Sequence, residues 1–218
     1  MASRAKPRLP LSRERILRAA LELVDEGGIE ALSMRKLGRT LGFEAMSLYN
    51  HVANKHDVID GILDLVFDET ELPSAEGPWA AAIRSSAVSV HDALRRHPWA
   101  GPLVMSPGHL RPARIDHMNA LLGRLREAGF SADATYTAYH VLDGHIFGFA
   151  LWENSHSYAP AEATGFVDAF DRLIPKEIYP YVHEHGRQHF SEGPHREVSS
   201  FELGLDLILD GLRKLPAG

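Results

Sequence analysis

Residues 33–55, SMRKLGRTLGFEAMSLYNHVANK, constrain the fold more than any other stretch of this chain. Apolar residues recur at helical spacing up to Leu41, and Gly42 directly after them suits the left-handed residue that ends a helix. In the short segment that follows, only Leu48 and Val52 are clear apolar anchors. A helix with so little to bury does not form mainly for stability, and small or polar side chains at its start suit a DNA major groove. The stretch therefore predicts a helix-turn-helix.

The flanking residues complete a small domain around this motif. Ser12 is a good helix N-cap before an apolar stripe from Ile16 to Val24, and Asn54 can cap a further helix. We expect a helix-turn-helix DNA-binding domain over residues 12–67 with a three-helix core. Residues 1–11 are basic and contain two prolines, which predicts either a flexible arm that reaches DNA or a solubilising tail.

The charge distribution supports this division, although the total charge does not. The chain carries a net charge of −6, which alone argues against nucleic acid. Residues 1–57 hold 10 Lys+Arg and 7 Asp+Glu, a net of +3, whereas residues 58–218 hold 13 and 22, a net of −9. A basic head on an acidic body is typical of a DNA-binding unit joined to a sensing unit, although chance variation in surface charge gives the same pattern.

The second region, residues 78–218, follows a Pro- and Gly-containing break and shows no strand pattern. The fold class is therefore predicted as all-α, with a larger helical domain for ligand binding and dimerisation. Helices are expected at residues 79–96, 99–105, 112–128, 132–155 and 199–214, with less regular pieces at 162–173 and 175–189. For residues 112–128 the predicted buried stripe is Ile115, Met118, Leu121, Leu122 and Leu125.

Two of these helices have apolar faces wider than one neighbour would cover, residues 132–155 and 199–214. Such faces are typical of a domain centre or of a two-fold dimer axis, and glycines four apart allow close backbone approach. The predicted homodimer interface consists of Val141, Gly144, Gly148, Leu205, Ile208, Leu209 and Leu212.

Several classes of protein find no support in the sequence. There is no apolar run long enough for a membrane span and no secretory signal, and the absence of cysteine fits a cytoplasmic location. No phosphate loop, nucleophile elbow or H-E-x-x-H motif indicates an enzyme, and no cofactor is expected. Thirteen histidines, some clustered within residues 183–195, indicate either metal ligands or a mobile surface segment; no convincing ligand set is present.

The segment ILRAALELVDEGGIEALSMRKLGRTLGFEAMSLYNHVANKHDVIDGIL resembles the DNA-binding domain of TetR-family (tetracycline-repressor-like) transcriptional regulators. Its L-G-x-x-x-x-(S/T)-L-Y-x-H and N-K pattern is specific. GFSADATYTAYHVLDGHIFGFALWENSH and SFELGLDLILDGLRKL also resemble the tetracycline-repressor subgroup. The resemblance implies an all-helical homodimer that binds a palindromic DNA operator, most often as a repressor. A small-molecule inducer would release the operator, whose half-sites are about 34–36 Å apart. A metal-dependent helical enzyme and a regulator without an inducer stay open as alternatives.

The resemblance also assigns DNA contacts residue by residue. Groove-facing glutamine and proline of the tetracycline repressors are replaced here by Ala45 and Met46, so a bidentate adenine contact is lost and a thymine methyl contact becomes available. The operator should therefore differ. The predicted DNA-binding residues are Ser33, Arg35, Lys36, Ala45, Met46, Ser47, Tyr49, Asn50, His51 and Lys55.

The predicted inducer site departs from the subgroup as well. The drug-contacting asparagine and phenylalanine align with Ser86 and Val90, and the glutamate that assists the metal aligns with Trp152. Tetracycline–magnesium is therefore not the expected inducer, and a less polar ligand is. His140 and Asp143 are expected to bond either to each other or to the ligand. The predicted ligand-binding residues are Ser86, Val90, His97, Met105, His109, Met118, Tyr136, His140, Asp143, Phe147 and Trp152.

Overall fold

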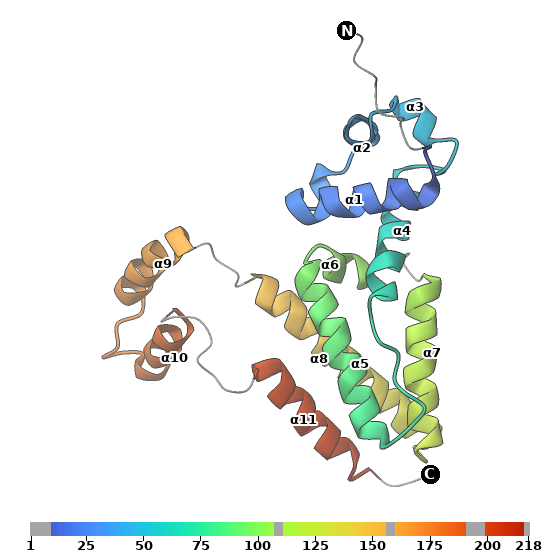
Figure 1. Ribbon diagram of the computed structural model, residues 1–218. Helices are drawn as coiled ribbons and strands as arrows, with labels where there is room; N and C mark the ends of the chain where they lie inside the picture. Colours follow the sequence, from blue (N-terminus) through green and yellow to red (C-terminus); the bar gives the residue numbers. More distant parts are fainter. Residues whose placement is uncertain (1–9, 107–110, 156–159, 191–198, 216–218) are drawn as a thin grey trace.

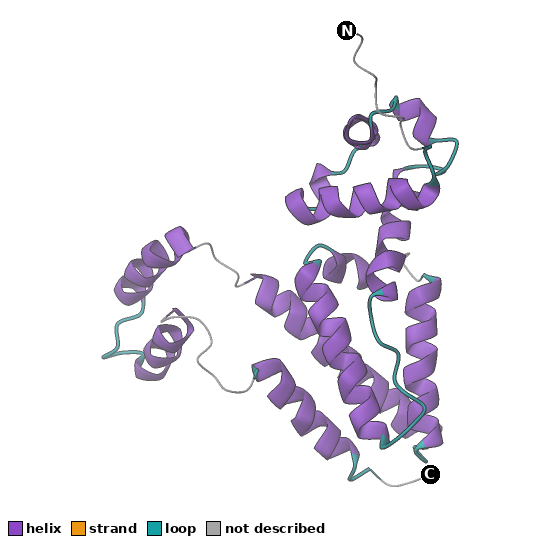
Figure 2. Ribbon diagram, viewed as in Figure 1, coloured by secondary structure: helices purple, strands orange, loops and turns teal. Residues whose placement is uncertain are grey.

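The computed structural model describes residues 10–106, 111–155, 160–190 and 199–215, which form helices joined by turns, without a strand among them (Figures 1 and 2). The prediction of an all-α fold is confirmed. The helices are α1 (Arg13–Gly27), η1 (Ile29–Ala31), α2 (Met34–Leu41), α3 (Ala45–Leu48), α4 (Lys55–Asp68), α5 (Trp79–Arg96), α6 (Ala100–Val104), α7 (Pro112–Glu127), α8 (Ala132–Ser155), α9 (Pro160–Leu173), α10 (Pro180–Phe190) and α11 (Ser200–Leu212).

The N-terminal part of the chain, residues 12–67, is called the head, and the rest of the chain from residue 78 is called the body. In the head, helices α1, α2 and α4 each begin at a predicted N-cap residue whose side chain accepts a backbone hydrogen bond. Ser12 and Ser33 accept hydrogen bonds from the backbone N–H three residues on, at 3.2 Å in each case. Asn54 accepts from the backbone N–H of Asp57 at 2.9 Å. Each cap satisfies a backbone donor that has no partner within its helix, which fixes where α1, α2 and α4 begin.

The turn between α2 and α3 is as tight as the sequence predicts. Gly42 ends α2 in the left-handed conformation, with φ 76° and ψ 28°. Gly38 lies so close to the following turn that a Cβ there would stand 2.9 Å from the carbonyl oxygen of Phe43. Leu37 and Leu48 are fully buried beneath this turn. The two helices of the motif are therefore held at a fixed angle by backbone contact.

Helix α4 belongs to both halves of the molecule. It packs against α1 in the head and against α5, α6 and α7 in the body, and Figure 1 shows it descending from one to the other. Its buried residues serve both cores: Val58 and Ile62 near its start, Val66 and Phe67 near its end. Helix α4 is therefore a continuous element that joins the head to the body.

The body is a bundle in which α8 packs against α5, α7, α6 and α11. Its interior consists mainly of Ile83, Val90, Leu94, Leu121, Leu125, Ala138, Leu142, Ile146, Phe147, Phe201, Leu205 and Leu209. Helix α8, which was predicted to lie at a domain centre or at a dimer axis, leaves Val141 and Trp152 exposed in the single protomer. None of the described helices has the length and apolar character needed to cross a bilayer.

Helices α9 and α10 pack on each other and stand to the side of the bundle (Figure 1). The sequence predicted a helix from about residue 175, but α10 begins at Pro180. The carbonyl of Pro175 accepts hydrogen bonds from the backbone N–H groups of Ile178 and Tyr179, which makes a turn before the helix. Pro180 then suits the first helical position, because its missing N–H would have no partner there.

Candidate functional site

The short helix α3 presents one face to solvent and one to the head core. Met46 is 75% exposed and Tyr49 is 43% exposed, whereas Leu48 and Val52 are buried on the opposite side. Such high exposure of a methionine is unusual, because folded proteins usually bury this residue. The ten predicted DNA-binding residues are each at least partly exposed: Ser33, Arg35, Lys36, Ala45, Met46, Ser47, Tyr49, Asn50, His51 and Lys55.

An ion pair fixes how this face is presented. Both terminal nitrogens of the Arg13 guanidinium donate to the Asp57 carboxylate at 2.9 Å, and the same carboxylate accepts from the backbone N–H of Ala53 at 2.8 Å. The hydrogen bonds from Arg13 lower the pKa of Asp57, so the pair stays charged at neutral pH. The start of α1 is thereby tied to the turn between α3 and α4, and that turn positions α3.

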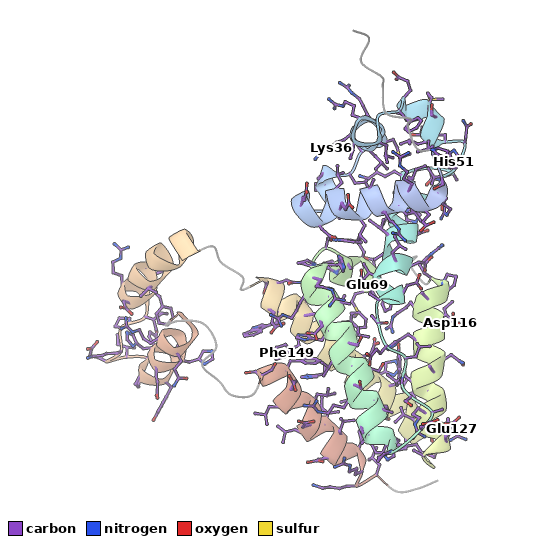
Figure 3. All side chains as sticks on the ribbon, in the orientation of Figure 1. Lys36, His51, Glu69, Asp116, Glu127 and Phe149 are labelled. Atoms are coloured by element: carbon purple, nitrogen blue, oxygen red, sulfur yellow. The ribbon has the colours of Figure 1, made fainter. Side chains whose placement is uncertain are left out.

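The head surface carries cations where a phosphate backbone would pass. Arg35, Lys36 and Arg39 are exposed on α2, and Lys55 is exposed at the start of α4. Figure 3 shows Lys36 and His51 at the opposite end of the molecule from Glu127. Exposed cations beside a short helix with an apolar and hydroxyl-bearing face give phosphate contacts and base-edge contacts on one surface.

A polar joint connects the head to the body. One oxygen of Asp25, near the end of α1, accepts from His97 Nδ1 and from Trp99 Nε1, both at 2.7 Å. Glu69, just after α4, accepts from Arg96 at 2.8 Å and lies 3.4 Å from His97 Nε2. His97 was predicted to bind ligand; the structure instead places it between two carboxylates of the head, where it links α1 and α4 to the end of α5.

A second connection runs from α4 to the start of α7. Arg111 contacts Asp60 and Asp64 of α4, each at 3.3 Å. Arg111, Arg114 and His117 recur every three residues on α7, so they lie along neighbouring turns of one side. The side of α7 that faces the body interior therefore also contacts α4.

The side of α7 that is buried differs from the prediction. Ile115 was expected inside but is 44% exposed, while Arg114 and His117 are buried together with Leu121 and Leu125. The apolar stripe is continuous only from Leu121 onward, so it did not fix the orientation of the first two turns. The structure turns an arginine and a histidine inward and an isoleucine outward.

Arg114 is the centre of an interior polar cluster. Its Nη2 donates to Asp143 Oδ1 at 2.5 Å and to the Tyr139 hydroxyl at 3.1 Å. Its guanidinium carbon lies 4.8 Å from the ring centre of Phe147 and 5.8 Å from that of Phe67. The buried guanidinium charge is therefore paired with the Asp143 carboxylate and is also in contact with two aromatic rings.

His117 extends this cluster toward α5. The Ser86 hydroxyl donates to the backbone carbonyl of Glu71 at 2.7 Å and lies 3.0 Å from His117 Nε2. Because that hydroxyl has one proton, His117 Nε2 must be the donor, and Nδ1 then carries a lone pair. Burial, reinforced by the nearby Arg114 charge, lowers the pKa of His117 to about 4, so the ring is neutral at pH 7. His117 Nδ1 and Thr135 Oγ1 are buried without a hydrogen-bond partner among the described residues.

The predicted ligand residues divide into groups. Ser86, Asp143 and Phe147 belong to the interior cluster, Met118 is half-buried against the core, and Val90 is buried within it. His109 lies outside the described residues. Met105, Tyr136, His140 and Trp152 are exposed in the single protomer and lie outside the interior cluster, so their ligand role stays a prediction.

Of the two alternatives for His140 and Asp143, the bond to each other is absent, and the bond to a ligand stays a prediction. His140 Nδ1 is 2.8 Å from the carbonyl oxygen of Tyr136 on its own helix, and it does not bond to Asp143, which pairs with Arg114. Side chains three residues apart on a helix differ by only about 60° in direction, so His140 and Asp143 lie at the edge between the exposed and the buried side of α8, with His140 exposed and Asp143 half-buried.

The predicted dimer residues also separate into two sets. Val141, Gly144 and Gly148 are exposed on α8, and Ile208 is half-buried. Leu205, Leu209 and Leu212 are buried inside the protomer, so the prediction that they face a partner is wrong. They share the side of α11 that packs against α5 and α8. The outward side of α11 carries Leu203 and Leu207 instead, which are 53% and 67% exposed.

Trp152 lies beside a hollow of about 430 Å³ on the α8–α11 face. Its other lining residues are Gly144, His145, Gly148, Phe149, His185 and Ser200. Figure 3 shows Phe149 where α8 approaches α11. His183 forms an ion pair with Asp171 at 3.2 Å. Within the described residues no group of three His, Cys, Asp or Glu side chains could hold a metal ion.

Sequence reasoning missed Arg114, His117 and Thr135. One available signal was the recurrence of Arg111, Arg114 and His117 at three-residue spacing in a helix whose apolar stripe is incomplete at its start. For Thr135 the signal was its four-residue spacing from Tyr139 and Asp143, which places all three on the α7-facing side of α8.

Comparisons with known proteins agree with this architecture. A family model described as "Bacterial regulatory proteins, tetR family" matches residues 16–62, and one described as "Tetracyclin repressor-like, C-terminal domain" matches residues 72–215. The chain is 31% identical to the HTH-type transcriptional repressor DrrR1 of Streptomyces coeruleorubidus, over 97% of this chain and 80% of that protein.

Two further relatives cover nearly the full length. The class D tetracycline repressor protein of Escherichia coli is 28% identical over 91% of this chain and 93% of its own. The crystal structure of the Streptomyces coelicolor TetR family protein ActR in complex with actinorhodin is similar with a TM-score of 0.75 and 27% identity, covering 94% of this chain and 96% of that one.

Proposed function

This chain belongs to the TetR family of bacterial regulatory proteins, and we propose that it is a transcriptional repressor that binds a two-fold symmetric DNA operator as a homodimer and is released by a small-molecule inducer. The family is one of DNA-binding regulators and not of enzymes. The proposed place of action is the cytoplasm, where the DNA is.

The observation that carries the proposal is the divided character of α3. Its buried side holds Leu48 at zero exposure, while Met46 projects into solvent with 75% exposure. An α-helix fits the major groove, and apolar side chains there contact the thymine methyl group. We propose that Ala45 and Met46 read an A·T-containing step, that Ser47 and Asn50 bond to neighbouring base edges, and that the exposed Arg35, Lys36, Tyr49, His51 and Lys55 hold phosphates, with Ser33 on the backbone.

We further propose that the inducer acts at the interior cluster of α7. Phe67 at the end of α4 lies beside Arg114, and Arg111 ties the start of α7 to Asp60 and Asp64 of the same helix. A ligand that moves Arg114 therefore moves the end of α4. Because α4 also packs against α1, the head would rotate with it and the two recognition helices would lose their operator spacing.

The test begins with selection of bound duplexes from a random-sequence library by the purified full chain. The affinity for the selected duplex is then measured by fluorescence anisotropy for wild type and Tyr49→Ala. We expect about a tenfold loss, because a phosphate contact is removed. Tyr181→Ala is the matched control, since Tyr181 is 83% exposed and belongs to α10, a helix that lies beside the body and away from the head in Figure 1. An affinity of Tyr49→Ala within about threefold of wild type would contradict the assignment of this face.

A further inference from the structure

The interior cluster around Arg114 contains buried polar atoms that have no hydrogen-bond partner among the described residues. His117 Nδ1 and Thr135 Oγ1 are buried without a partner among the described residues, and both residues are more than nine-tenths buried. Buried polar side chains nearly always have a hydrogen-bond partner, since leaving one unmade is costly. Each such exception therefore calls for a specific explanation.

The hydrogen bonds around His117 determine whether its Nδ1 is a donor or an acceptor. Ser86 gives its only proton to the carbonyl of Glu71, so it accepts from His117 Nε2. The neutral ring then presents a lone pair at Nδ1. What this nitrogen lacks is a donor, such as a hydroxyl or an N–H group.

A cationic donor stands one helical turn from that acceptor. Arg114 and His117 are three residues apart on the inward side of α7. Both hydrogen bonds of Arg114 within the cluster, to Asp143 and Tyr139, leave from the same nitrogen, Nη2. A guanidinium has five donors in a planar fork, so it can bond to an oxygen of a ligand in addition to Asp143 or in its place.

Aromatic rings complete the set. The ring of Phe67 lies 6.4 Å from the His117 ring, centre to centre, and 5.8 Å from the Arg114 guanidinium carbon. The ring of Phe147 lies 4.8 Å from the same carbon. One aromatic side chain of α4 therefore lies next to both polar groups, and its face is a suitable partner for a flat ring.

From this arrangement we propose that the inducer is a planar aromatic compound that carries a phenolic hydroxyl next to a carboxylate or carbonyl oxygen. The hydroxyl donates to His117 Nδ1, Arg114 binds the neighbouring oxygen, and the ring packs on Phe67. This inference rests on the proposed function, because it names the ligand class of the same regulator. It replaces the less polar ligand that the sequence indicated, since sequence reasoning did not place Arg114 and His117 inside.

The test uses calorimetric titration of the full-length protein with 1-hydroxy-2-naphthoate and with 1-methoxy-2-naphthoate. The two probes share ring and carboxylate, and only the first can donate to His117. We expect the hydroxy compound to bind about tenfold or more tightly than the methoxy compound. In His117→Leu this preference should disappear, and in the double variant Arg114→Met/Asp143→Leu, which keeps the interior free of an unpaired charge, both probes should bind weakly.

Controls separate this chemistry from general instability. Ile115→Ala changes an exposed residue of the same helix and should keep the full preference. Equal affinity of the two probes for wild type, or no binding of either, would overturn the inference. Operator affinity is measured in parallel without any probe. If the protein binds the operator but neither probe, the inference about the ligand is wrong and the proposed function stands. If it binds the probes but no operator, the proposed function is wrong.

Discussion

At the scale of single residues, the orientation of α7 is the feature with the largest consequences. Arg114 and His117 are buried while Ile115 is exposed. An ion pair such as Arg114–Asp143 is often less stabilising than apolar residues of similar volume, because both ions lose their water. A chain selected for stability alone would place the isoleucine inside. The arrangement agrees with the binding role that we propose for this cluster.

The first prediction concerns the pH dependence of stability. The pKa of His117 is lowered to about 4 in the folded protein from about 6.5. Above pH 6.5 the ring is neutral in both the folded and the unfolded state, so its protonation does not lower the free energy of unfolding. As pH falls from 6.5 toward 4 the unfolded chain takes up a proton that the folded protein does not, and stability falls by up to about 3 kcal/mol. Urea unfolding at pH 7.5, 6.0 and 5.0 measures this for wild type and His117→Gln.

The variant should lose less stability between pH 7.5 and pH 5.0 than wild type does. His91, whose pKa is also lowered, mainly by burial, is present in both proteins and cancels in the comparison. Parallel pH profiles for the two proteins would show that His117 titrates normally and is not enclosed as described.

At the scale of elements, the sequence predicted helices well where caps and periodicity agreed. Ser12, Ser33, Asn54 and Gly42 mark the ends of α1, α2 and α4 as expected, because capping is a local interaction readable from neighbouring residues. The direction in which a helix faces depends on partners distant in sequence. That is why the inward side of α7 and the buried side of α11, with Leu205 and Leu209, could not be predicted.

The candidate site shows the same division. The residues of the head surface were assigned one by one through the family resemblance, and the structure leaves each of them at least partly exposed. The interior cluster was predicted only in part, through Ser86, Asp143 and Phe147. The joint formed by Asp25, His97 and Trp99 was not predicted, because Asp25 is more than seventy positions from the other two residues in sequence.

The second prediction concerns that joint. Asp25→Ala removes the acceptor of both His97 Nδ1 and Trp99 Nε1, which are buried donors. We expect a loss of about 2 kcal/mol in the free energy of unfolding. We also expect faster amide hydrogen exchange in α6 and at the end of α1. The neighbouring exposed carboxylate offers a matched control, Glu26→Ala, which should change neither quantity. Exchange that rises equally over all helices would argue against a local joint.

At the scale of the whole molecule, two surfaces are left for partners. The head carries exposed cations and Met46, and the α8–α11 side of the body carries exposed apolar residues. Val141, Leu203 and Leu207 lie on the latter, together with two glycines that allow close approach. Regulators of this family are dimers, and we propose that the second surface is the dimer interface, which would fix the distance between two copies of the first.

The third prediction follows from the corrected side of α11. Leu203→Glu/Leu207→Glu should give folded monomers, because both side chains point away from the protomer interior and charges there oppose association. Leu205→Glu, by contrast, should unfold the body, since Leu205 is fully buried. Sedimentation velocity with circular dichroism distinguishes the two outcomes. A dimer that survives the double substitution would show that this side of α11 lies outside the interface.

The central claim is that two heads, held at a fixed distance by the body, bind one face of DNA together. It is tested most directly by measuring the affinity of the full chain for its selected duplex and for the same duplex with five base pairs inserted at the centre. The insertion turns one half-site about half a helical turn away from the other. The predicted result is a loss of at least about a hundredfold, because only one head can then bind. Equal affinity for the two duplexes would contradict the account.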